Sequence, residues 1–310
     1  MINMNTLLDP ATLFISEEDW NNESQRDVFL KYLLDNFSTI DKYKITQILW
    51  TGEFDELLWC QPNIPPWRSD KDFKNAMVPI IFKFLQKNKA EMDVLQDECS
   101  VRPNFQCECY KKDASRHFLK IAHEVLARRE DVFFCISPEN RRGDAIYTFF
   151  CECHETQLVP TIISAYKQWL KYVDLARDFW PANDTEKEKR CFREALTICA
   201  ETLSLERKNF LYEFDFSKLF MEDLVGTSTY REQVIEAITT RLLLQQNEAS
   251  RYTGLNDEPV SGRCCKYGGK KIDVRRFRVS EGNRIHYCYI GSNKILFLRY
   301  YKEGHHDDGL

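Results

Sequence analysis

The sequence predicts a two-domain protein, with an α/β domain over residues 1–207 and an α+β domain over residues 208–310. The length of 310 residues suits two domains of ordinary size, since most contain about 100–200 residues. In the first two-thirds of the chain, apolar strand-like runs alternate with helical patterns, which is typical of α/β domains. In the last third, one strand and a helix precede three strands that are joined by tight turns.

The elements of the first domain follow from apolar periodicity and from breaks at proline and glycine. The expected elements are a strand within residues 3–15, a helix over 24–37, an apolar strand over 45–50, helices over 72–87 and 115–129, strands over 131–137 and 145–153, and a long helix or helix pair over 161–205 that is interrupted at 180–184. A proline-rich break at 61–67 separates the first strand–helix–strand group from the rest. The domain boundary is expected near Lys208.

The second domain is the more informative part of the sequence. Its expected elements are a strand over residues 209–216, a helix over 229–246, a loop over 254–259, and strands over 271–280, 284–290 and 294–301. Glu281-Gly282-Asn283 and Gly291-Ser292-Asn293 are good hairpin turns between the last three strands. These strands are therefore expected to form an antiparallel meander.

Charge is distributed unevenly along the chain. The formal net charge is −5, but residues 206–310 contain 17 Lys+Arg against 15 Asp+Glu, and residues 263–302 contain 11 against 2. The rest of the chain, with 26 basic and 33 acidic residues, carries about −7. The basic stretch is a candidate surface for a polyanion, and the alternative is a solvated sheet face with cross-strand salt bridges.

Composition also indicates the compartment. No apolar run approaches the roughly 18–20 residues that a membrane span needs, and the N-terminus lacks the pattern of a secretory signal. The 12 Cys are scattered over a long chain, so reduced and mostly buried thiols are expected rather than a disulfide framework. A cytoplasmic protein that does not bind a membrane is therefore predicted.

Alternation along the last strands separates a polar face from an apolar face. Arg276 and Arg278 share one face of their strand, and Arg284 and His286 share one face of the next. If helices cover the apolar face, these four side chains gather on the other one. Clustered guanidinium groups match phosphates through paired hydrogen bonds, so a phosphate-binding surface is expected there.

The C-terminal third of the chain resembles the RelE/ParE superfamily of bacterial toxins. The resemblance lies in the order of elements, in the loop Tyr252-Thr253-Gly254-Leu255, and in Arg276-Phe277-Arg278 followed by a glycine turn and Arg284-Ile285-His286-Tyr287. It implies helices packed on a curved antiparallel sheet. It further implies an mRNA interferase, an endoribonuclease that enters the ribosome and cuts mRNA by making the ribose 2′-hydroxyl attack the neighbouring phosphate, without a metal or another cofactor.

The resemblance and the charge pattern together assign candidate roles. The candidate catalytic residues are Arg284, His305, His306 and Tyr301, and the candidate RNA-binding residues are Arg275, Arg276, Arg278, His286, Lys270, Lys271, Arg299 and Lys302. Cations stabilise the charge that builds on the phosphate, and a histidine serves as general acid or base. The alternative is a non-catalytic scaffold of the same superfamily that binds RNA, the ribosome or a protein, as the ParE branch binds gyrase.

The first domain has no recognised family and is expected to act as a sensor or regulatory domain. Cys107, Cys109, Cys151, Cys153 and His154 could hold zinc, although buried thiols are the simpler reading. A second alternative is a metal-dependent nuclease built from the acidic residues Asp9, Glu53, Asp55, Asp131 and Asp144, for which the simpler reading is solvated surface acids. Arg141-Arg142-Gly143-Asp144 either binds a phosphate or nucleotide or forms an ordinary charged turn.

The expected partners follow from these assignments. They are mRNA and the ribosome, with a separate antitoxin, a small-molecule or nucleotide signal at the N-terminal domain and a second copy of the chain as further candidates. The acidic first domain could also dock on the basic face and restrain it, since the charges are complementary.

Overall fold

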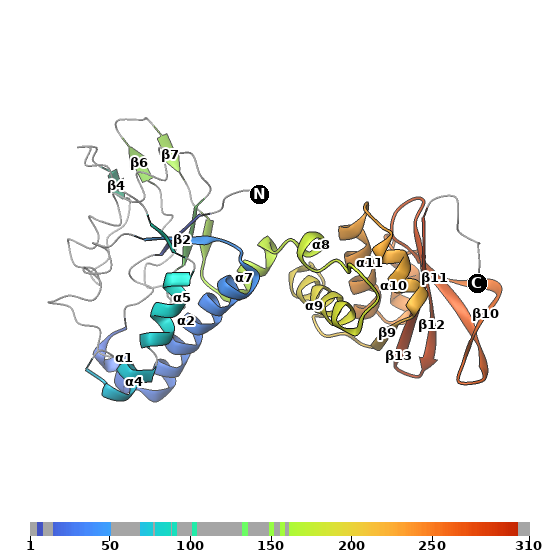
Figure 1. The fold of residues 1–310 in the computed structure, drawn as a ribbon, viewed down its shortest axis with the longest axis horizontal. Coiled ribbons are helices and arrows are strands. Elements are labelled where there is room, and N and C mark those ends of the chain that lie inside the picture. The colour runs from blue at the N-terminus through green and yellow to red at the C-terminus, as the bar shows by residue number, and fades with distance from the viewer. Residues whose placement is uncertain are drawn as a thin grey trace. The chain divides into compact units, whose positions relative to one another are not determined.

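The computed structural model describes residues 5–8, 15–50, 69–76, 78–87, 89–91, 101–103, 132–135, 149–151, 156–158 and 161–302. The chain divides into two compact units, Met1–Tyr172 and Val173–Leu310, named here unit 1 and unit 2 (Figure 1). The predicted mixture of α-helices and β-sheets is confirmed. In the described part of the chain, no helix has both the length and the apolar composition that crossing a membrane requires.

Unit 1 contains a parallel sheet with helices. Its elements are β1 (Asn5–Leu8), α1 (Glu17–Asn21), α2 (Glu23–Tyr43), β2 (Gln47–Trp50), α4 (Lys71–Ala76), α5 (Val78–Lys87), β3 (Lys89–Glu91), β4 (Val101–Pro103), β5 (Val132–Cys135), β6 (Phe149–Cys151), β7 (Thr156–Leu158), β8 (Thr161–Ile163), α7 (Tyr166–Trp169) and η3 (Leu170–Tyr172). Five strands pair in the order β3-β2-β1-β5-β8, and every pairing is parallel. A separate antiparallel sheet has the order β4-β6-β7.

Helix α2 is longer than the sequence predicts. The Asn22 side chain caps its start by accepting hydrogen bonds from the next backbone amides, and Lys44 ends it in a left-handed conformation with φ 50°. Phe29, Leu33 and Phe37 recur at helical spacing and are buried. The helix therefore packs one apolar stripe into unit 1 and presents charged residues on the other side.

Unit 2 is an α+β unit. Its elements are α8 (Leu175–Asp178), α9 (Glu186–Thr202), β9 (Glu213–Phe216), α10 (Lys218–Val225), α11 (Arg231–Leu243), α12 (Gln246–Arg251), β10 (Glu258–Tyr267), β11 (Lys270–Arg278), β12 (Arg284–Gly291) and β13 (Lys294–Tyr301). The sheet order is β10-β11-β12-β13-β9. Strands β11 to β13 form the predicted antiparallel meander. Strand β10 adds to it in the antiparallel direction, and β9 pairs with β13 in parallel.

The core of unit 2 lies between the sheet and helices α9, α10 and α11, which Figure 1 shows on one side of the strands. Phe216, Phe220 and Phe297 form its aromatic centre, with ring centroids 5.6–5.8 Å apart. From α11, Val234 and Ile238 are fully buried against this centre. The helices thereby cover one face of the sheet, and on the other face Val274, Cys288 and Leu298 form a second, smaller buried cluster.

Several sequence-based expectations need correction. The unit boundary falls after Tyr172 rather than near Lys208, because Phe192 and Leu196 of α9 are buried in the core of unit 2. Residues 161–163 form strand β8 instead of beginning a helix. The sheet of unit 2 is mixed rather than antiparallel, because β9 joins it in parallel. Strand β10 was not expected, and its first two residues fall in the predicted loop over 254–259, because Pro259 and Gly262 interrupt its pattern at a register shift.

Ser217 joins the sheet to the helical layer. Its hydroxyl accepts from the Phe220 amide at 3.0 Å, as the N-cap of α10, and donates to the Leu298 carbonyl of β13 at 2.7 Å. Ser217→Ala is expected to lower the free energy of unfolding by about 1–2 kcal/mol, because a cap and a cross-element hydrogen bond are lost. Urea unfolding checks this, with the exposed Ser228→Ala as a control that should change little; equal effects of the two substitutions would contradict the assigned role.

Candidate functional site

Six side chains on the sheet face of unit 2 opposite the helices form the strongest candidate site. They are Arg276, Arg278, Arg284, His286, Arg299 and Tyr301, named here the arginine face. The strand register places them in two rows that cross three strands. Arg276, His286 and Arg299 oppose one another in the first row, and Arg278, Arg284 and Tyr301 do so in the second. Directly opposed residues on paired strands lie about 4.5–5.5 Å apart at Cβ.

The intervening residues explain why these side chains share a face. Phe277, Ile285 and Tyr300 alternate with the arginine-face residues along β11, β12 and β13, and all three are buried in the core beneath the helices. Burial of this apolar set fixes the register, because a slip by one residue would turn it toward the arginine face. The predicted common face of Arg276, Arg278, Arg284 and His286 is confirmed.

Two of the four arginines have carboxylate partners. Arg276 pairs with Glu258 at 2.8 Å, and both side chains are partly exposed, at 31% and 53%. Arg299 holds Asp223 through Nε and Nη2 at 2.8 and 3.2 Å, and the guanidinium lies 5.4 Å from the Tyr301 ring. Four guanidinium groups thus face two carboxylates, which leaves an excess of positive charge among the described residues.

The other two arginines lie side by side without a carboxylate partner among the described residues. Arg284 donates to the backbone carbonyls of the turn after β11, at 2.8–3.0 Å. The Nε of Arg278 is buried and has no hydrogen-bond partner in the part of the chain that the structure describes. Burial, followed by repulsion from Arg278 and Arg276, lowers the pKa of Arg284. Crowded cations with an unused donor would be relieved by an anion.

His286 and Tyr301 lie deeper than the arginines. The side chain of His286 is fully buried and that of Tyr301 is 3% exposed, and their ring centroids are 4.5 Å apart. Tyr301 was expected to be catalytic and His286 to contact RNA directly. The structure instead buries both rings, and the Tyr301 ring lies against the Arg299 guanidinium.

The remaining predicted residues lie elsewhere. Lys270 and Lys271 are exposed at the tip of the β10–β11 hairpin, and Lys271 is five residues from Arg276, about 17 Å along the strand. Lys302 follows β13 and donates to the Gly226 carbonyl at 2.7 Å. His305 and His306 lie outside the described residues, as do most residues of the candidate zinc, carboxylate and nucleotide sites of unit 1.

Arg275 belongs to a buried ion-pair network on the helix side of the sheet, which is a correction to its expected place on the RNA-binding surface. Its Nε and Nη2 donate to Asp257 Oδ1 at 3.0 and 2.9 Å. Asp257 Oδ2 lies 2.5 Å from Nε of Arg241 and accepts from the Tyr287 hydroxyl at 2.7 Å. The side chains of Arg241 and Asp257 are both 0% exposed, so this network serves the fold.

The network also positions the arginine face. Asp257 directly precedes Glu258, the first residue of β10, and Asn256 before it adopts a left-handed conformation with φ 47°. Asp257 points toward the helices while Glu258 reaches Arg276 on the opposite side. Sequence reasoning missed Arg241 and Asp257. The available signal was Arg241 beside Leu242, at the end of the apolar row of the predicted helix. A buried arginine requires an acid as its partner.

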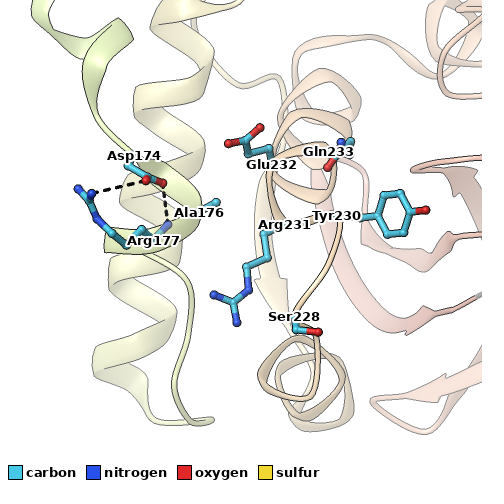
Figure 2. Close-up of a pocket in the computed structure, with 8 residues that line it drawn as sticks. All are labelled: Asp174, Ala176, Arg177, Ser228, Tyr230, Arg231, Glu232 and Gln233. Atoms are coloured by element: carbon cyan, nitrogen blue, oxygen red, sulfur yellow. Dashed lines mark hydrogen bonds and ion pairs between the residues drawn. The ribbon is translucent and has the colours of Figure 1, made fainter. Parts of the chain in front are cut away.

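A second candidate in unit 2 is an open groove of about 480 Å³ between α8 and the start of α11 (Figure 2). It is lined by Asp174, Ala176, Arg177, Ser228, Tyr230, Arg231, Glu232 and Gln233. Arg177 is bound to Asp174 and Asp178, and Arg231 donates to the Thr227 carbonyl at 3.0 Å. The charges of this groove are mixed and its cations are already engaged, so the arginine face is the stronger site.

Neither a cluster of metal-binding side chains nor a similarity to a known protein adds to the description of this site. Within the described residues, no three His, Cys, Asp or Glu side chains gather as metal ligands. Comparisons of the chain with protein-family models, with curated proteins and with solved structures give no match. The functional argument therefore depends on the geometry of the arginine face.

Proposed function

We propose that unit 2 binds the phosphate backbone of RNA on the arginine face and acts as a RelE-like mRNA interferase on the ribosome, under the control of unit 1. The observation that carries this proposal is the pair of adjacent arginines, Arg278 and Arg284, whose cations crowd each other beside an unused buried donor. A phosphate would accept a hydrogen bond from that donor and offset the repulsion between the two guanidinium groups. Strand β9, the helices that follow it and strands β11 to β13 come in the order that the resemblance implies, whereas α9 and β10 are additional elements.

The proposed chemistry uses the arginine face and the C-terminal tail, residues 303–310, that follows β13 and Lys302. Arg278 and Arg284 hold the scissile phosphate and stabilise the charge that develops when the ribose 2′-hydroxyl attacks. His305 or His306 takes the hydroxyl proton or protonates the leaving oxygen. Both histidines come after Lys302, outside the described residues. Arg276 extends the face toward a neighbouring phosphate. The RNA competes with Glu258 for this arginine.

A specific observation supports the non-catalytic alternative. The two rings of the arginine face that could exchange protons or stack on a base, His286 and Tyr301, are buried. Within the described residues, a face that offers cations but neither an exposed histidine nor an exposed tyrosine suits binding of RNA or the ribosome without cleavage. Loss of His305 and His306 distinguishes the two proposals, because only cleavage depends on these histidines.

For unit 1 we infer a regulatory role that responds to a small-molecule or nucleotide signal. Its parallel sheet has the order β3-β2-β1-β5-β8, so the direction of strand addition reverses between β1 and β5. In open parallel sheets, ligands bind at the carboxyl ends of the strands beside such a reversal. The separate antitoxin remains a candidate partner of unit 2, and a second copy of the chain a candidate partner of the whole.

Mapping of mRNA 5′ ends by primer extension after expression in cells tests the proposed cleavage. The wild-type chain is expected to create new ends within translated regions, and Arg284→Ala combined with His306→Ala is expected to abolish them. No new ends with the wild-type chain, or the same ends with the double variant, would contradict the nuclease. Growth arrest without new ends that survives loss of both histidines, but not loss of Arg278 and Arg284, would support the binding module.

A further inference from the structure

Two cysteine sulfurs meet on the same side of the unit 2 sheet as the arginine face. The Sγ atoms of Cys265 in β10 and Cys288 in β12 are 3.1 Å apart. Non-bonded heavy atoms usually approach to about 3.5–4.0 Å, and a disulfide bond is about 2.05 Å long. The two sulfurs are therefore closer than an ordinary contact and separated by about 1 Å more than a bond.

The bend of β10 explains how the two sulfurs meet. Cys265 is opposite Ile272 of β11, and Cys288 is opposite Val274 of β11, so one strand lies between them. In a flat sheet, strands that flank a common neighbour are about 9–10 Å apart. The register shift between Pro259 and Cys264 bends β10, which brings Cys265 toward Cys288.

The surroundings of the pair are apolar. Val274 and Leu298 are buried beside Cys288, and Val260, Ile272, Ile290 and Leu296 pack around them. Cys288 is fully buried, whereas Cys265 is half-buried and Cys264 is exposed. Burial, followed by the neighbouring Cys265, raises the pKa of Cys288. Cys265 is thus the thiol that a small oxidant reaches first, and Cys288 is the one held in place to react with it.

We propose that Cys265 and Cys288 form a reversible disulfide bond when the protein meets a peroxide. The Cys265 thiolate attacks one oxygen of hydrogen peroxide, the O–O bond breaks, and the products are a sulfenic acid and, after proton uptake, water. The Cys288 sulfur then attacks the sulfenic sulfur, the S–O bond breaks, and the hydroxyl leaves as water with the Cys288 proton. Two electrons pass from the thiols to the peroxide in total.

Reversibility follows from the position of the pair. Cys265 is only half-buried, so one sulfur of the disulfide stays within reach of a reductant. Exposed disulfides are among the readily reduced ones. A dithiol restores both thiols by exchange. The proposal does not depend on RNA binding, although the bond would lie two residues from His286 of the arginine face.

Peptide mapping of the full chain tests the proposal. The reduced protein is treated with hydrogen peroxide under native conditions, free thiols are blocked with N-ethylmaleimide, and tryptic peptides are analysed by mass spectrometry. Peptides 264–266 and 285–294 are expected to appear as one linked species and to separate after dithiothreitol.

Two variants identify the bridging cysteine. Cys264→Ser removes the exposed neighbour and is expected to leave the link unchanged, whereas Cys265→Ser is expected to abolish it. Absence of the linked species in the wild-type chain while Cys265 is oxidised to its sulfinic acid would overturn the proposal. A link that persists in Cys265→Ser, and is lost in Cys264→Ser, would overturn it as well. A Cys264–Cys265 bond alone, with peptide 285–294 still blocked by maleimide, is a third contradicting result.

Discussion

Replacing Asp257 by asparagine is expected to lower the free energy of unfolding of unit 2 by about 3–5 kcal/mol, because Arg241 would remain as a buried charge without its counterion. Burial opposes the charge on Arg241, but interactions with Tyr287 and Asp257 outweigh it and raise its pKa, so the side chain stays protonated. The same carboxylate holds Arg275 and Tyr287. Its loss therefore affects the helix, the sheet and the start of β10 together.

Glu258→Gln is the matched control for this substitution. Glu258 is the next residue and also pairs with an arginine, but its side chain is 53% exposed, so its loss is expected to cost at most about 1 kcal/mol. Hydrogen exchange of the β11 and β12 amides across a urea series measures both variants within unit 2. Equal and small effects would show that the buried network does not stabilise the unit, contrary to this account.

Removal of Arg278 and Arg284 together is expected to weaken binding of single-stranded RNA by about a hundredfold, since each charge-assisted contact to a phosphate is worth about 1.4 kcal/mol or more. Both side chains lie on the side of the sheet opposite the helices, and Phe277 and Ile285 of the core remain in place. Fluorescence anisotropy with a labelled oligonucleotide measures the change. A loss below about threefold would contradict the assigned role of the two arginines.

Arg190→Ala combined with Arg251→Ala is the control for net charge. Both arginines are exposed on helices, α9 and α12, and neither belongs to the arginine face. This variant has the same net charge as the Arg278/Arg284 variant, so binding that depends only on overall charge would fall equally in both. The account predicts that it retains nearly the affinity of the wild-type chain.

The polar face of unit 2 could be predicted because strand alternation is a local property. Phe277 and Ile285 need the core, so their neighbours Arg276, Arg278 and Arg284 must point the other way, and two clear turns fix the hairpin register. The burial of each side chain on this face could not be predicted in the same way. His286 lies on the predicted face but is fully buried, because its burial depends on the curvature of the sheet and on neighbours distant in sequence.

Other misses have similar physical causes. Arg275 appears as one more cation in a basic run, yet its partner Asp257 lies in a segment that was expected to be a loop, and only the three-dimensional structure joins them to Arg241. Helix α9 was placed in the first domain because its sequence indicates a helix but not the sheet that its apolar stripe covers. Pairing over long sequence distances is the information that periodicity lacks.

The salt dependence of RNA binding tests most directly the central claim, that Arg278 and Arg284 hold phosphates. Affinity of the full chain for a single-stranded RNA is measured over a series of salt concentrations, for the wild type and for the Arg278→Ala/Arg284→Ala variant. Each phosphate contact adds about 0.7 to the slope of log affinity against log salt concentration, so the variant's slope should be shallower by about 1.4. Identical slopes for the two proteins would contradict the claim, because the two arginines would then contact no phosphate.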